Sequence, residues 1–443
     1  MLIEKYKNHD KVTKMELKFQ RRPFPAVTVC NLNPYVSSEI TTESDIIRRT
    51  LRSYEYRLEF LNNRTQDPKF TIPNPPKYLD VDVNKYKDVN DTVALQSKAK
   101  MEVLFLAHQM EEEEQRRLSY SLTELILSCS FNMDDCDMEE DGEDFTLFAD
   151  PKFGNCWTFN YKRKSTHNST RAGPLYGLRM VLSTNHSEYL ATSEASGVRV
   201  VVHNQTEFPF PDTFGYNAAS GYATSLGISY REIKRLGQPY GDCRKQMVEE
   251  TMKNLYMNNN YSMYTMESCF RTCIQEKASS ICGCSDPRYS VHPNYTSCSL
   301  EQKPCLEKID ITSCKQCPQP CEQGVYDVTV STARWPSGVF QVPGCYLDSI
   351  EECTLQSREN ALMLEVFFEQ LNYKLLTESA TYTMVNLVSD FGGQAGLWLG
   401  VSVVTAVEVL VLIFQLICCR VYAQDRIDDE TEKRKKSSAT TSR

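Results

Sequence analysis

The longest apolar stretch of the chain lies near its C-terminus. Between Leu397 and Cys419 only Glu408 carries a charge and only Gln415 carries an amide. A run of about 20 apolar residues spans a bilayer as a helix, whereas an amphipathic core helix keeps a polar face. We therefore predict one transmembrane helix in residues 390–419.

Basic residues follow this stretch directly, at Arg420, Arg426 and Lys433 to Lys436. Because cytoplasmic segments next to a membrane helix carry excess Lys and Arg, we expect the C-terminus in the cytoplasm and residues 21–389 outside the cell. Residues 420–443 are strongly charged and end in Ser and Thr, which predicts a disordered cytoplasmic tail.

Upstream, shorter periodic patterns predict a mixture of strands and helices. Alternating or β-branched runs predict strands at 24–33, 153–160, 197–206 and 213–236. Helical patterns occupy 43–62, 97–128 and 262–278, and the proline-rich segment 66–95 is expected to be an irregular loop. Residues 361–378 fit a helix or a long strand. The fold class is thus α+β.

Cysteine usage places this large region in an oxidising compartment. Sixteen of the 18 cysteines lie upstream of the membrane stretch, together with seven glycosylation sequons, at Asn63, Asn90, Asn168, Asn185, Asn204, Asn260 and Asn294. Such a combination is typical of a disulfide-bonded, glycosylated ectodomain. The net charge of −9 and the absence of long basic blocks give no indication of nucleic-acid binding.

Residues 243–321 hold the densest group of cysteines. Cys269 and Cys273 are four residues apart on a predicted helix and share one face, which suits two parallel disulfides from that helix. Cys314-x-x-Cys317 and Cys282-x-Cys284 leave zinc binding as an alternative, but no pair of CxxC motifs has finger spacing. We expect no metal site and no cofactor.

Several motifs resemble those of the epithelial sodium channel and degenerin family. They are FPAVT-x-CN in 24–31, GNC-x-TFN in 154–160, the cysteine series of 243–321, and Asp390-Phe-Gly-Gly-Gln followed by Gly400-Val401-Ser402 and Glu408. The amino-acid sequence of this last segment is most similar to those of invertebrate degenerins. The resemblance implies a disulfide-rich extracellular domain with a β core, a finger-like region at 43–150 and a thumb-like region at 243–321.

This resemblance also implies a function and its residues. Three homologous or identical subunits would form an amiloride-sensitive, sodium-permeable channel in the plasma membrane. Gly400, Val401 and Ser402 would form the selectivity filter, Ser389 and Asp390 would lie at the gate, and Glu408 would supply negative charge to the pore. Val401 departs from the small residue of many members, so the exact ion preference stays open. Rings of carbonyl and hydroxyl oxygens suit the dehydration of small cations.

Disulfide pairs are likewise implied by the resemblance and not by spacing. They are Cys30–Cys156, Cys129–Cys136, Cys243–Cys321, Cys269–Cys317, Cys273–Cys314, Cys282–Cys305 and Cys284–Cys298. Cys345 and Cys353 remain without an implied partner and could close a local loop. The acidic run 134–144 is either a solvated loop or, as in acid-sensing relatives, a sensor of protons or divalent cations. Tyr240 matches an aromatic residue at the junction between the ectodomain and the membrane helices.

Residues 1–20 are too charged for a signal peptide. Family members carry a first transmembrane helix just before the segment that this region resembles, so we expect residues 1–20 to be a remnant after a missing helix, in a protein that is multi-pass when complete. Two other classes stay open. A single-pass receptor, adhesion protein or non-conducting regulatory subunit would need no glycine and glutamate in its anchor, and an enzyme would need a catalytic motif, which the spacing does not provide.

Overall fold

A computed structural model describes the chain except for residues 1, 21, 67–74, 76–78, 140–141, 162–166, 246–253, 258–260, 316, 341, 344–348, 401 and 441–443. The chain divides into two compact units. The larger unit comprises Lys14–Thr377, and the smaller one comprises Met1–Thr13 with Glu378–Arg443. Each unit is described by itself.

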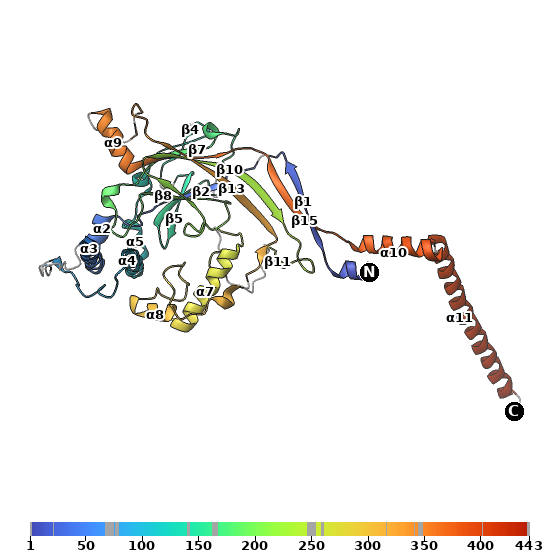
Figure 1. The fold of residues 1–443 in the computed structure, drawn as a ribbon. Coiled ribbons are helices and arrows are strands. Elements are labelled where there is room, and N and C mark those ends of the chain that lie inside the picture. Colours follow the sequence, from blue (N-terminus) through green and yellow to red (C-terminus); the bar gives the residue numbers. More distant parts are fainter. Residues whose placement is uncertain are drawn as a thin grey trace. The chain divides into compact units, whose positions relative to one another are not determined.

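The larger unit is built around two sheets (Figure 1). The first sheet has the strand order β1-β15-β10-β14-β7-β3-β4, with β13 paired antiparallel to β10. Its strands are β1 (Lys11–Lys18), β3 (Ile126–Phe131), β4 (Asp134–Asp135), β7 (Leu178–Ser183), β10 (Tyr222–Lys234), β13 (Glu322–Arg334), β14 (Ala361–Phe368) and β15 (Tyr373–Ala380). The long strand β10 carries the parallel strands β14 and β15 one after the other.

The second sheet has the order β5-β6-β2-β8-β9. Its strands are β2 (Ala26–Asn31), β5 (Phe145–Asp150), β6 (Gly154–Phe159), β8 (Gly197–His203) and β9 (Tyr216–Ala219). The main core cluster takes side chains from both sheets, among them Val27, Phe159, Leu226 and Leu364. The strands expected at 24–33, 153–160, 197–206 and within 213–236 are therefore confirmed, and their apolar positions form this core.

Helices surround the sheets in two groups. The first contains α2 (Ser37–Glu43), α3 (Asp45–Gln66), α4 (Thr92–Ala107), α5 (Glu112–Arg117) and α6 (Leu122–Leu125), and α3 packs against α4. The second, between β11 (Cys243–Arg244) and β12 (Gln319–Pro320), contains α7 (Met266–Cys282) and α8 (Lys303–Leu306). Helix α9 (Ile350–Asn360) precedes β14.

The prediction of a single helix at 97–128 is wrong. The structure divides this segment into α4, α5, α6 and the strand β3. Capping boxes at Glu111 and Ser121 start new helices, since each cap satisfies backbone groups that a continuous helix would bond internally. Residues 126–131 then pair with β7 and bury Phe131, so tertiary burial overrides helical propensity.

The ambiguous segment 361–378 forms strands β14 and β15. The burial of β14 alternates from Ala361 to Phe368, as a strand with one face on the core requires. Within the described residues of this unit, short 3₁₀ helices lie at Pro174–Tyr176, His186–Glu188, Leu300–Gln302 and Thr312–Lys315.

The smaller unit contains α1 (Leu2–Lys7), α10 (Met384–Leu399) and α11 (Val403–Thr440). The disordered tail expected after residue 419 is wrong, because α11 continues to Thr440. No glycine or proline occurs after Gly400. Residues 420–437 are also rich in Lys, Arg and Glu, which favour helix.

Candidate pore segment

The apolar C-terminal segment is not one continuous helix. Helix α10 ends at Leu399, and Gly400 adopts a left-handed conformation with φ of 67°. The Gly400 N–H donates to the carbonyl of Gly396 at 3.1 Å, which caps the end of α10. Glycine suits this position, since an L-residue with a Cβ is strained at positive φ.

Ser402 begins the next helix. Its hydroxyl accepts a hydrogen bond from the backbone N–H of Thr405 at 3.2 Å, and its carbonyl accepts the N–H of Ala406 at 3.0 Å. This is the N-cap arrangement that serines favour. Val401, the middle residue of the predicted filter, lies outside the described residues.

The break between α10 and α11 leaves backbone groups available for other partners. The last carbonyls of a helix and the first N–H groups of the next have no partner within a regular helix. A Cβ placed on Gly400, Gly393 or Gly392 would meet no atom within 4 Å, so the surface around these glycines is open in the single chain. A second backbone or a cation can approach such a surface closely.

The segment that is long and apolar enough to cross a membrane is Val403–Gln424 in α11, with a mean hydropathy of 2.2. Its side chains are exposed in the single chain, as lipid-facing or partner-facing residues would be. The transmembrane segment expected at 390–419 therefore comprises the end of α10 and the start of α11, with the interruption between Leu399 and Val403. Glu408 lies within the span, where a charged group is costly unless water or a partner accompanies it.

The two residues predicted at the gate lie on α10. Ser389 and Asp390 are both exposed. The hydroxyl of Tyr382 donates to Oδ2 of Asp390 at 2.7 Å, a contact that no sequence motif indicated. Burial of the tyrosine ring and this hydrogen bond raise the pKa of Tyr382 above its ordinary value, so the phenol remains a donor at neutral pH.

Disulfides occur at the pairs that the resemblance implies. The structure joins Cys30 to Cys156, Cys129 to Cys136, Cys243 to Cys321, Cys269 to Cys317, Cys273 to Cys314, Cys282 to Cys305 and Cys284 to Cys298. The cysteines of the zinc alternative are therefore bonded to sulfur. Cys353 is disulfide-bonded as well, and Cys345 lies outside the described residues.

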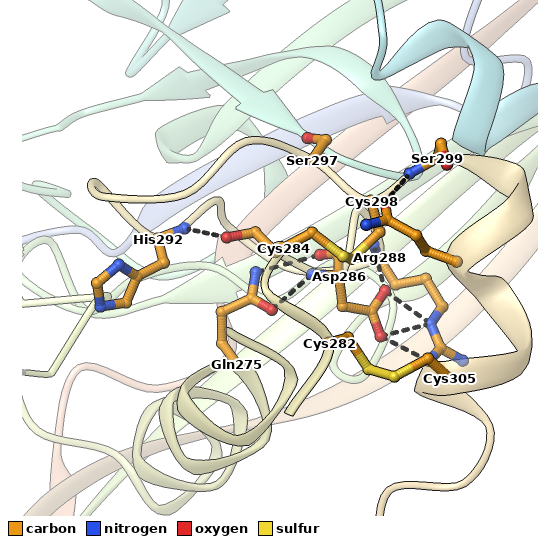
Figure 2. Close-up of a disulfide and its surroundings, with 12 residues drawn as sticks. Gln275, Cys282, Cys284, Asp286, Arg288, His292, Ser297, Cys298, Ser299 and Cys305 are labelled. Atoms are coloured by element: carbon orange, nitrogen blue, oxygen red, sulfur yellow. Dashed lines mark hydrogen bonds and ion pairs between the residues drawn. A yellow bond between two sulfur atoms is a disulfide. The ribbon is translucent and has the colours of Figure 1, made fainter. Parts of the chain in front are cut away.

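A hydrogen-bonded loop packs beside two of these disulfides (Figure 2). Gln275 of α7 accepts the N–H of Asp286 at 2.8 Å and donates to the Asp286 carbonyl at 3.1 Å. Arg288 binds both carboxylate oxygens of Asp286. These contacts fix the chain between Cys284 and Cys298 against α7.

The other predicted surface sites are distributed over the larger unit. The sequon residues Asn90, Asn168, Asn185 and Asn294 are exposed, Asn63 and Asn204 are partly buried, and Asn260 lies outside the described residues. In the acidic run, Asp137 accepts two backbone N–H groups and Asp144 bonds His167 at 2.6 Å. Among the residues described, no group of three or more His, Cys, Asp or Glu is arranged for a metal ion. Tyr240 lies in a turn after β10.

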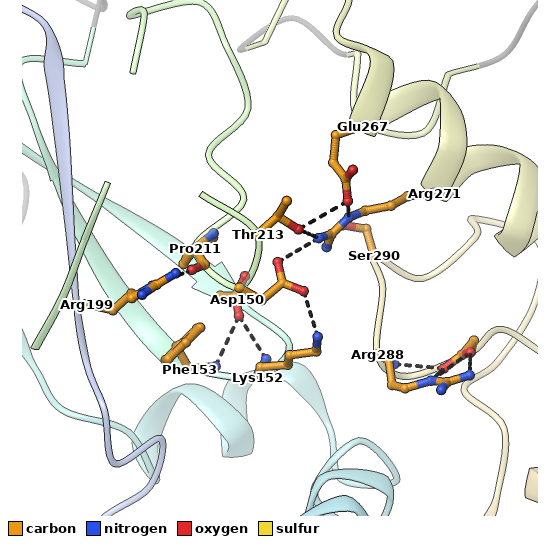
Figure 3. A network of polar contacts seen from close by, with 12 residues as sticks. Asp150, Lys152, Phe153, Arg199, Pro211, Thr213, Glu267, Arg271, Arg288 and Ser290 are labelled. Atoms are coloured by element: carbon orange, nitrogen blue, oxygen red, sulfur yellow. Dashed lines mark hydrogen bonds and ion pairs between the residues drawn. The ribbon is translucent and has the colours of Figure 1, made fainter. Parts of the chain in front are cut away.

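A buried ion-pair network was also missed by sequence reasoning (Figure 3). Arg271 of α7 donates to Asp212 at 2.7 Å and to Glu267 at 2.7 Å, and Lys152 donates to Asp212 at 2.6 Å. The Arg271 side chain is only 7% exposed. In the sequence, the i,i+4 spacing of Glu267 and Arg271 indicates an ion pair on one helix face. It does not indicate the distant partner Asp212.

Electrostatics in this network oppose the cost of burial. Burial alone would raise the pKa of Asp212, but the Lys152 hydrogen bond and the Arg271 charge outweigh it and lower that pKa. Burial would lower the pKa of Arg271, and the two carboxylates raise it instead. The network thus holds α7 to the loop that follows β8.

The disulfide pairs and the break between α10 and α11 agree with the resemblance that the sequence motifs indicated. The family model of the amiloride-sensitive sodium channel matches residues 1–412. The chain belongs to this family.

Similar proteins include nematode degenerins. Degenerin deg-1 of Caenorhabditis elegans is 43% identical over 348 residues, covering 75% of this chain and 44% of the relative. Degenerin mec-10 of the same organism is 43% identical over 343 residues, covering 75% of this chain and 46% of the relative. The degenerin-like protein asic-1 of that organism is 40% identical over 342 residues, covering 75% and 40%. The chain spans less than half the length of these curated relatives.

Proposed function

We propose that this chain is a subunit of a trimeric, amiloride-sensitive, sodium-permeable channel of the plasma membrane, gated by an extracellular stimulus. The observation that carries the proposal is the break between α10 and α11 at Gly400 and Ser402. A plain membrane anchor gains nothing from such a break, since every unsatisfied backbone group in lipid is costly.

Three copies of the break around one axis would form a ring of oxygens. The Gly400 carbonyl and the Ser402 hydroxyl would replace part of the hydration shell of a sodium ion. Glu408 lies six residues further along the chain and would add negative charge to the path, which favours cations over anions. Membership of the family supports this assignment, and so do the disulfides described for residues 21–389.

The disulfides and the basic residues after the span also support a membrane topology. Disulfides form in oxidising compartments, so residues 21–389 would face the exterior. The basic residues after the span would keep the C-terminus in the cytoplasm. Ser389 and Asp390 would then lie on the outer side of the break, where a gate could close the path.

The experiment is expression in oocytes, with and without a related degenerin subunit, and recording of amiloride-sensitive current. Single cysteines at Ser402 and Glu408, in a background with Cys418 and Cys419 changed to Ala, should react with a thiol reagent and block the current. Leu410→Cys is the matched control, because two residues along a helix turn about 200° away from Glu408.

A single-pass receptor or a non-conducting regulatory subunit is the alternative. It predicts surface expression without any current of its own and no effect of the thiol reagent at position 402. Surface labelling of the same cells separates this result from a failure of the chain to reach the membrane.

A further inference from the structure

A cavity of about 400 Å³ lies in the larger unit. Strands β8, β9 and β13 line it together with the loop 207–215. Volumes of this size are typical of sites for small molecules. Its wall contains the aromatic rings of Phe208, Phe214, Tyr216 and Tyr326.

One carboxylate, that of Glu207, faces this aromatic lining. No lysine or arginine lines the cavity among the described residues. The nearest imidazole cannot neutralise the carboxylate. Burial lowers the pKa of His203 to about 4, and its ring nitrogens already contact the hydroxyl of Thr28 and the carbonyl of Asn204.

We propose that this cavity binds a small organic cation, an amine or guanidine with an apolar body. A partly buried carboxylate without a cationic partner favours a ligand that brings the missing charge. Aromatic faces around it add cation–π attraction and apolar contact. An inorganic divalent cation fits less well, since such ions need several oxygen ligands and the cavity offers one carboxylate.

The loop that lines the cavity is also the loop that holds α7. The guanidinium of Arg271 lies 4.7 Å from the ring centre of Phe210 and donates to Thr213 at 2.7 Å. Figure 3 shows Thr213 of this loop beside Arg271, and Pro211 of the same loop beside Arg199. A ligand in the cavity would therefore restrain the loop and, through Arg271, the position of α7.

Binding should depend on pH. Burial raises the pKa of Glu207 to about 7, opposed by a backbone hydrogen bond of Asn204. The other titratable groups around the carboxylate are His203 on β8, Tyr216 on β9, Tyr230 on β10 and Tyr326 on β13. Burial lowers the pKa of His203 and raises the pKa of Tyr230 and of Tyr326, which keeps these three groups uncharged near neutral pH. The carboxylate is therefore the group that gains charge between pH 6 and pH 8.

The test uses the full chain in lipid nanodiscs, with benzylammonium as the probe and benzyl alcohol as its neutral counterpart. Calorimetry or ligand-observed NMR gives the dissociation constants. We expect saturable binding of benzylammonium, weaker binding of benzyl alcohol by at least roughly tenfold, and roughly tenfold tighter benzylammonium binding at pH 8 than at pH 6.

Glu207→Gln keeps the shape of the side chain and should remove both the preference for the cation and the pH dependence. Glu276→Gln, at an exposed site on α7, makes the same change in charge and should alter neither. Val328→Phe fills the cavity from β13 and should abolish binding of both probes. Equal binding of the two probes, an unchanged affinity in Glu207→Gln, or no saturable binding would overturn the proposal. None of these results depends on whether the chain conducts ions.

Discussion

The phenolic hydroxyl of Tyr382 donates a hydrogen bond of 2.7 Å to Oδ2 of Asp390. Tyr382 precedes α10 and Asp390 lies two turns inside it, so the bond fastens the entry of the chain to the helix. Thr383 caps the same helix end by accepting the N–H of Asn386 at 3.3 Å. The first two turns of α10 are thus held by side chains instead of by burial.

Replacing Tyr382 with Phe should loosen this helix end. The loss of one hydrogen bond to an exposed carboxylate should make amide exchange at the start of α10 severalfold faster. Hydrogen–deuterium exchange of residues 384–390 measures the change. Tyr6→Phe is the control, because that hydroxyl has no bond to α10 in the described structure. Unchanged exchange in Tyr382→Phe would show that the bond does not hold the helix.

Arg271 should be among the most costly charged residues to remove from the larger unit. Arg271→Met leaves Asp212 and Glu267 buried with one cation fewer, and breaking a buried pair costs about 3 kcal/mol or more. Arg116→Met is the matched control, since that side chain is 48% exposed and its partner Glu112 is 73% exposed, so its loss should cost much less. Denaturant unfolding of both variants gives the comparison, and equal losses would contradict the assignment.

The same network predicts the acid sensitivity of the fold. The pKa of Asp212 is lower in the folded state than in the unfolded chain, so the stabilisation is complete above the unfolded value near 3.9 and is lost as the pH falls toward the folded value. In wild type, stability should therefore fall below about pH 4, and Asp212→Asn should be less stable at pH 7 with a weaker dependence on acid. Unfolding free energies at pH 3, 4 and 7 measure this difference.

Much of the fold could be predicted from the sequence, for identifiable physical reasons. The strands β2, β6 and β8 alternate or carry β-branched residues, so their pattern agrees with the core that they form. The single helix predicted at 97–128 is wrong because new helices start at the caps of Glu111 and Ser121, which only local hydrogen bonds reveal.

The candidate site was predictable only where the chemistry is local. Gly400 and Ser402 are separated by one residue, and their roles as helix cap and helix start follow from the missing Cβ of the glycine and the hydroxyl of the serine. Arg271 and Asp212 are 59 residues apart and meet only through the fold. The cavity beside Glu207 likewise combines β8, β9 and β13, so no local pattern could indicate it.

Disulfides that close long loops should contribute more than those that close short ones. Cys30–Cys156 closes a separation of 126 residues, and Cys129–Cys136 one of 7. In the chain-entropy model, removing them as paired Ala variants should cost about 5 and about 2 kcal/mol. Thermal unfolding of the oxidised proteins tests the order, and an equal loss would indicate that strain or packing dominates.

Ser389 should tolerate only small side chains if α10 closes the pore. Ser389→Phe would crowd neighbouring helices in the closed state at a cost of about 1–3 kcal/mol, which raises the ratio of open to closed channels roughly 5- to 150-fold. Resting current in oocytes, normalised to surface labelling, measures the effect. Ser389→Ala, which adds no bulk, should keep the resting current of the wild type. Closure of Ser389→Phe like the wild type would place the gate elsewhere.

The break between the membrane helices should be sensitive to one methyl group at Gly400 and to the hydroxyl of Ser402. Gly400 has φ of 67°, where an added Cβ costs about 1–2 kcal/mol, so Gly400→Ala should shift the backbone around the break. Ser402→Ala removes both the oxygen proposed for the filter and the cap that accepts the Thr405 N–H. Ser402→Thr keeps both and is the matched control. Reversal potentials in mixed sodium and potassium solutions should therefore shift in Gly400→Ala and Ser402→Ala but stay close to the wild type in Ser402→Thr. If both alanine variants conduct with unchanged reversal potentials, the break is a feature of helix packing and the ions are selected at another level of the pore.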